Sequence, residues 1–332
     1  MNIDKRNIKY DIIKSIAAFL ICIYHLDITD FGQFYTGQTY YPNFNKIILG
    51  VCSAGVPLFF VISGALALTK YASKYYFISK AISALKIYTI WSIICGITIT
   101  SMLNLQLNLN NFLISINYLW FFQSLSFLYI FTILFNMIKT NKYTYFIPII
   151  ILICPFVINF LYDIFLIFDI NIKPHRTGFF RLYSLLYFTL LFFYKPHFSF
   201  IKSFIFIILG LFLIALDVYL FTNYNGYIFD GVNSSFPTIG ALFITLGIYC
   251  VFNNIEYDPN SRIVKIAAFW GKNCLGIYLF HMPIIVFIKQ FLVHGKVNIL
   301  YALFITIIIM TISSIVFYFL RKIQFIKWAL KL

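Results

Sequence analysis

The chain has 332 residues, of which 62% are hydrophobic and 11% are charged, and its mean hydropathy is +0.90. Soluble domains carry charge on about 25% of their residues, so this composition excludes a soluble protein and predicts a membrane protein. The net charge of +15 does not indicate nucleic-acid binding, because the basic residues are spread over the breaks between apolar segments and form no single patch.

Apolar segments long enough to cross a hydrocarbon core of about 30 Å recur along the whole chain. We therefore predict an all-α polytopic membrane protein with about ten transmembrane helices. The expected helices cover residues 10–29, 47–69, 81–103, 116–138, 144–162, 179–194, 203–222, 236–252, 267–288 and 299–319. Between the third and the fourth, the uncharged segment 104–115 is expected to lie at the outer interface.

Lysine and arginine predict the orientation, because cytoplasmic loops of membrane proteins carry an excess of both. Placing the N-terminus in the cytoplasm puts most of the 25 basic residues on that side. An even number of helices returns the chain there, so both termini are predicted to be cytoplasmic. The expected organisation is an integral-membrane domain at 8–320, with membrane lipids as partners, and a short basic cytoplasmic tail at 321–332.

Lys14 and His25 stand eleven residues apart in the first segment, which is almost three helical turns, so they share one face roughly 16 Å apart along the axis. Ionisable residues are costly in a bilayer, and an aligned pair suggests a ligand lying lengthwise. A neutral imidazole accepts a proton from a hydroxyl, so His25 is a candidate general base. Asp11 is placed to pair with Lys14. The alternatives are a lysine that anchors the helix and a histidine that only bonds a neighbouring helix.

Two later segments supply further candidates. In GVPLFFVISG, residues 55–64, Ser63 offers a hydroxyl to a neighbouring helix, although ordinary helix packing accounts for the motif as well. In LGIYLFHMPII of the ninth segment, Tyr278 and His281 point the same way, and Pro283 frees a backbone carbonyl near them. Histidines on the first and ninth segments at matching depth predict a shared polar cavity.

Lys80 and Lys86, near the cytoplasmic end of the third segment, extend a positive rim around Lys14 that either binds phosphate or only sets orientation. The six cysteines form no CxxC pair, and the five histidines show no HxxxH or HExxH spacing. The sequence therefore predicts no metal site.

Four motifs in this order resemble the integral-membrane acyltransferase family 3. The first motif is a basic residue followed, after ten residues, by His in the first segment. The others are G-x-P-x-F-F-x-x-S-G in the second segment, Leu-Trp-Phe at 119–121 and I-Y-L-F-H-x-P at 277–283. The resemblance covers roughly residues 8–320. It implies about ten spans in the bacterial cytoplasmic (inner) membrane and transfer of an acyl group, usually acetyl from cytoplasmic acetyl-CoA, to extracytoplasmic surface polysaccharides such as O-antigen. It places the essential histidine of the family on His25, its first basic residue on Lys14 and its late histidine on His281.

The chain departs from the family pattern at three positions. Lys14 stands where the family usually has Arg, and a lysine lacks the bidentate fork that Arg offers a phosphate. The Arg-x-x-Arg of the family reads Lys80-Ala81-Ile82-Ser83, and its frequent His before Leu-Trp is Tyr118. These departures concern the donor site more than the fold.

The resemblance and the spacing of Lys14 and His25 together suggest a mechanism. The nucleotide end of acetyl-CoA would bind Lys14, Lys80 and Lys86, and the thioester would meet His25, acting as base or as transient acyl carrier. A hydroxyl of a surface polysaccharide or lipid-linked glycan would attack, with Tyr278, Ser63 or His281 stabilising the oxyanion. The rival interpretations are a polysaccharide or lipid-linked sugar flippase or transporter without acyl transfer, and an O-antigen polymerase, which the short outer loops disfavour.

Overall fold

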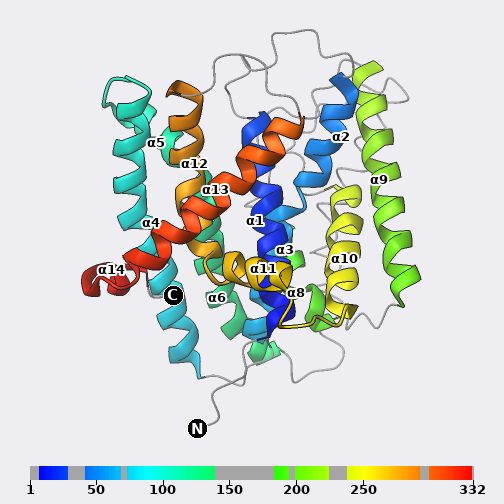
Figure 1. Cartoon of the computed structure of the whole chain (residues 1–332). Helices are drawn as coiled ribbons and strands as arrows, with labels where there is room; N and C mark the ends of the chain where they lie inside the picture. The colour runs from blue at the N-terminus through cyan, green and yellow to red at the C-terminus, as the bar shows by residue number, and fades with distance from the viewer. Residues whose placement is uncertain are drawn as a thin grey trace, which may run out of the picture. The chain divides into compact units, whose positions relative to one another are not determined.

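In the computed structural model, the described residues are 7–28, 42–68, 73–138, 183–193, 199–223, 238–291 and 299–330. They are almost entirely helical, with no strand among them, which confirms the all-α prediction. The chain divides into two compact units, and Figure 1 labels their helices. The first unit comprises residues 1–37, 72–130 and 256–332, and the second comprises residues 38–71 and 131–255.

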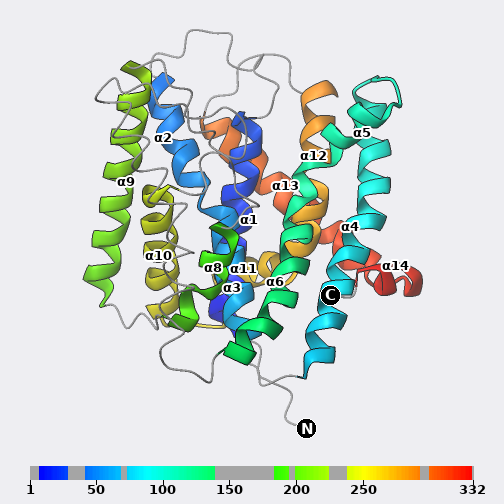
Figure 2. The same ribbon diagram turned by 180° about the vertical axis from the view of Figure 1, so that it is seen from behind.

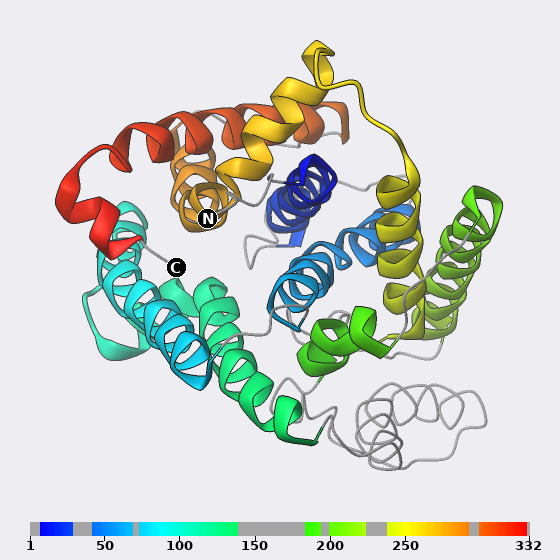
Figure 3. The ribbon, with the colours of Figure 1, turned by 90° about the horizontal axis from the view of Figure 1, so that it is seen from below.

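The first unit is built around α1 (Ile8–Ile28), which packs against α11 (Arg262–Lys272), α12 (Cys274–Phe291) and α13 (Ile299–Leu320). Seen from below, α11 and α13 run beside α1 (Figure 3). Small residues allow these close approaches. A Cβ on Gly276 would meet the side chain of Phe317 at 2.2 Å, so the phenyl side chain of α13 packs directly on the backbone of α12.

The remaining helices of the first unit pack on the other side of α12. They are α4 (Lys74–Met102), α5 (Leu109–Ile116), η2 (Asn117–Leu119), the beginning of α6 (Trp120–Ile138) and α14 (Gln324–Ala329). Figure 2 shows α4 beside α12 and α5, with α14 at its flank. Asn104, with φ 51°, makes the turn after α4, and α5 then returns along α4 so that Phe112 and Ile116 cover Gly96.

The predicted ninth helix at 267–288 is wrong at its start. The chain breaks at Asn273, whose backbone N–H bonds the carbonyls of Phe269 and Trp270, and α12 begins only at Cys274. The preceding residues form the separate helix α11, whose three basic residues, Arg262, Lys265 and Lys272, are exposed. A helix with a charged face packs along α1 instead of extending an apolar span.

The second unit contains α2 (Pro42–Cys52), α3 (Gly55–Leu68), α8 (Tyr183–Phe193), α9 (Phe200–Asn223), α10 (Ile239–Asn254) and the rest of α6. The predicted second helix at 47–69 is interrupted at residues 53 and 54, and Pro57 lies in the first turn of α3, where proline costs no helical hydrogen bond. Gly64 lets α3 approach the backbone of α8 at Phe188.

Five helical stretches among the described residues are long and apolar enough to cross a membrane: Ile47–Leu68, Lys74–Met102, Leu109–Phe135, Cys274–Phe291 and Leu300–Leu320. The apolar stretches Phe200–Leu216 and Ile239–Asn254 are shorter. The helix α1 is not among the five, because Lys9, Asp11 and Lys14 charge its first two turns. The predicted helix at 144–162 and the beginning of the one at 179–194 lie outside the described residues.

Candidate active site

Two histidines from distant parts of the sequence meet in the first unit. The ring centroids of His25 on α1 and His281 on α12 lie 5.0 Å apart, with their planes inclined by 46°. His281 is completely buried, and His25 is half-buried. The predicted meeting of these two side chains is confirmed, whereas the shared polar cavity and their chemical roles stay predictions.

Hydrogen bonds to the main chain determine the tautomer of His281. Its Nδ1 lies 2.7 Å from the carbonyl oxygen of Tyr278 and 3.2 Å from that of Ile277. A carbonyl only accepts, so Nδ1 carries the proton and donates it, which leaves Nε2 of the neutral ring as an acceptor. Nε2 is buried and has no hydrogen-bond partner among the described residues. A buried polar atom without a partner costs about 1–3 kcal/mol, which suggests that a ligand or a mobile proton meets it.

Aromatic rings enclose His281. The ring of Tyr118 stands edge-on to it at 5.3 Å, and the ring of Tyr278 lies at 5.6 Å. Phe121 and Phe122 in turn flank Tyr278, each at 5.4 Å. The imidazole therefore lies among aromatic rings, in an environment where hydrogen bonds are stronger than in water.

Tyr278 and Ser63, which are both predicted to stabilise an oxyanion, have different structural environments. The Tyr278 hydroxyl donates to the backbone carbonyl of Tyr118, so a role toward substrate would require it to exchange that bond. Ser63 belongs to α3 in the second unit and is half-buried. For both residues the catalytic role stays a prediction.

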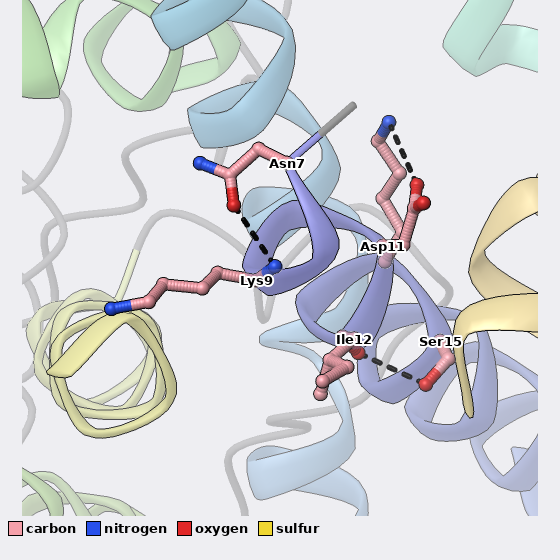
Figure 4. A network of polar contacts seen from close by, with 6 residues as sticks. Asn7, Lys9, Asp11, Ile12 and Ser15 are labelled. Carbon is pink, nitrogen blue, oxygen red and sulfur yellow. Dashed lines mark hydrogen bonds and ion pairs between the residues drawn. The ribbon is translucent and has the colours of Figure 1, made fainter. Parts of the chain in front are cut away.

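The first turns of α1 hold a polar network, which Figure 4 shows at close range. The Asn7 side chain accepts from the backbone N–H of Lys9 at 3.0 Å and so caps the helix. Lys14 lies with its Nζ 4.0 Å from a carboxylate oxygen of the buried Asp11, which confirms the predicted pair. Among the described residues, the hydroxyl of Ser15 bonds only the carbonyl of Ile12 within the same helix, at 2.9 Å. Asp11 thus orients the Lys14 cation.

The other two residues of the predicted donor rim have aromatic neighbours. Lys80 lies over the ring of Tyr76, with its Nζ 5.4 Å from the centroid. Lys86 donates to the backbone carbonyl of Trp328 at 2.7 Å and lies over the indole ring at 4.8 Å. Lys86 therefore holds α14 against α4, a contact that the sequence analysis did not anticipate. Donor binding by Lys80 and Lys86 stays a prediction.

Comparison with known families decides the kind of protein. The model of the acyltransferase domain family, acyltransferase 3, matches residues 7–318, nearly the whole chain. The chain belongs to this acyltransferase family. Neither the curated proteins nor the solved structures contain a match. Together with the five described stretches able to cross a membrane, the family makes the protein a multi-pass membrane acyltransferase.

This acyltransferase has further residues near the histidine pair that the sequence analysis missed. Tyr118 departs from the family pattern, yet its hydroxyl and ring both contact α12 near His281. Lys289 lies two helical turns beyond His281 and is only 9% exposed, which makes it a candidate functional residue, because ionisable residues are costly within a membrane helix. In the described ranges, no group of three or more His, Cys, Asp or Glu could hold a metal ion.

Proposed function

We propose that this acyltransferase moves an acyl group, acetyl in the first instance, from a cytoplasmic acyl-CoA to a hydroxyl of a cell-surface glycan such as O-antigen or exopolysaccharide. The acceptor would lie on the outer side of a bacterial inner membrane. The observation that supports this function is the pair of imidazoles 5.0 Å apart, one of them fully buried with an unpartnered Nε2. An acyl transfer to a hydroxyl needs a base that removes one proton, and this pair supplies it.

The proposed topology has ten membrane-spanning helices and both termini in the cytoplasm, with an acyltransferase domain at 8–320 and a basic tail at 321–332. Exposed basic residues on α11 and at the start of the tail, Arg262, Lys265, Arg321 and Lys322, support a cytoplasmic side for both. Lys14 then lies near the cytoplasm and His25 near the outer side, since α1 runs from one to the other.

In the proposed reaction, His25 takes the proton of the acceptor hydroxyl while the oxygen attacks the thioester carbonyl carbon. The tetrahedral intermediate collapses, the carbon–sulfur bond breaks, and the proton passes from His25 to the thiolate of coenzyme A. The neutral His281, with Nδ1 held by the Tyr278 carbonyl, offers Nε2 as an acceptor to the His25 imidazolium and stabilises its positive charge. The Lys14 ammonium would bind a phosphate of the donor.

Membrane vesicles from cells that carry the gene test this function. Labelled acetyl-CoA supplied at the cytoplasmic face should yield base-labile label in the surface glycan, and vesicles without the gene should not. His25→Ala should abolish the label, whereas Ser15→Ala, on the same helix, should retain it, because that hydroxyl bonds only its own helix. Wild-type labelling in His25→Ala would refute the proposed role of His25.

A further inference from the structure

Pro283 leaves one backbone carbonyl of α12 without its helical donor. In an α-helix, the carbonyl of residue 279 accepts from the N–H of residue 283, and proline has no N–H. Leu279 is completely buried in a helix long and apolar enough to span a membrane. Since hydrocarbon supplies no donor, another protein group must satisfy this carbonyl.

Tyr118 is that group. Its hydroxyl donates to the Leu279 carbonyl at 2.9 Å, across 161 residues of sequence, and the Cys95 thiol adds a weaker contact at 3.7 Å. Tyr278, next to Leu279, donates its own hydroxyl back to the carbonyl of Tyr118. Two hydrogen bonds running in opposite directions therefore join η2 to this turn of α12.

The same turn carries His281. The Tyr118 ring stands edge-on to the imidazole, with an interplanar angle of 88°, and the Tyr278 carbonyl holds its Nδ1. On the side of α4, Trp91 packs edge-on against Phe280 at 5.1 Å. The positions of residues 278–281 thus depend on contacts from other helices where the proline has weakened the helix itself.

We propose that Tyr118 is a positioning residue of the acyltransferase: it occupies the carbonyl that Pro283 releases and so fixes the turn of α12 that holds His281 against His25. Its catalytic consequence rests on the proposed function of the histidine pair. The mechanical part, the dependence of the α12 turn on the Tyr118 hydroxyl, is independent of donor and acceptor.

A double-mutant cycle tests the mechanical part. Tyr118→Phe removes only the hydroxyl, and Pro283→Ala returns an N–H that can serve the Leu279 carbonyl. In a protein whose native cysteines are replaced, His25→Cys and His281→Cys should react rapidly with a short bifunctional reagent. Adding Tyr118→Phe should slow this cross-linking about tenfold, and adding Pro283→Ala as well should restore at least half of the loss. If Tyr118→Phe slowed the cross-linking equally in the native Pro283 background and in the Pro283→Ala background, the proposal would be overturned.

The catalytic part is measured with labelled acetyl-CoA in vesicles of the otherwise native protein. Tyr118→Phe should lower kcat about tenfold with the KM for acetyl-CoA unchanged, because the residue positions the histidine and touches no donor. The exposed Tyr75→Phe serves as control and should retain both values. A raised KM with kcat unchanged would refute the positioning role. Absence of labelling by the wild type would instead refute the proposed donor, and the cross-linking cycle would then decide the inference alone.

Discussion

Gly271→Ala should separate α11 from α1 and destabilise the first unit. A Cβ built at Gly271 would lie 1.8 Å from the carbonyl oxygen of Asp11, 2.5 Å from its carbonyl carbon and 2.8 Å from its Cα. Ordinary contacts of this kind need about 3.4 Å or more, so the helices must move apart by more than 1 Å locally. The obstacle is backbone, which cannot rotate away as a side chain does.

Two energies oppose each other in this substitution. Replacing glycine by alanine within a helix gains about 0.5–1 kcal/mol from the lower entropy of the unfolded chain. Overpacking costs about 1–3 kcal/mol even where side chains can adjust, and here they cannot. The clash therefore wins, and we expect a net loss of about 1–2 kcal/mol in the free energy of unfolding.

The assay is thermal unfolding of the detergent-purified protein, followed by tryptophan fluorescence at a fixed heating rate. Lys272→Ala is the matched control, because Lys272 is exposed on the same helix, and it should shift the midpoint little. A midpoint for Gly271→Ala equal to or above that of the wild type would refute the close approach of α11 to α1.

Three further substitutions test separate parts of the site. Lys14→Ala should raise the KM for acyl-CoA with little change in kcat, while Lys14→Arg should retain or improve acyl-CoA binding. A fall in kcat with the KM unchanged in Lys14→Ala would contradict the role of Lys14 in phosphate binding. Lys86→Ala should release α14, because its ammonium is bound to Trp328, and the measurement is faster proteolysis of the C-terminus. An unchanged rate of proteolysis would contradict this anchoring. His281→Leu, which keeps much of the side-chain volume but offers no acceptor to the His25 imidazolium, should lower kcat at least tenfold; retained kcat would remove His281 from the reaction.

The features that were predictable from the sequence are those with a local cause. The first helix is predicted at 10–29 and is α1 (Ile8–Ile28), because residues 16–24 form a continuous apolar run. The meeting of His25 and His281 followed from the cost of burying two ionisable groups separately in a membrane. Asp11 and Lys14 pair because they are three residues apart on one helix.

Where prediction failed, hydrophobicity alone was ambiguous. Residues 267–273, AAFWGKN, read as the beginning of a span, yet they end the amphipathic helix α11 and turn the chain into α12. The pattern of apolar residues reports burial but does not say whether lipid or a neighbouring helix provides it. The contact of Lys86 with Trp328 was equally invisible, because 242 residues separate the two.

Tyr118 illustrates how a local rule acquires a distant partner. The proline at 283 predicts a carbonyl at 279 without its helical donor, and that much follows from the five residues 279–283. Which residue satisfies the carbonyl depends on η2 reaching α12, and this follows only from the packed helices. A helix that contains proline lacks one internal hydrogen bond, and the carbonyl left without its helical donor can bind a side chain from another helix. In this acyltransferase that side chain also packs against His281, so the missing helical hydrogen bond and the geometry of the histidine pair are linked.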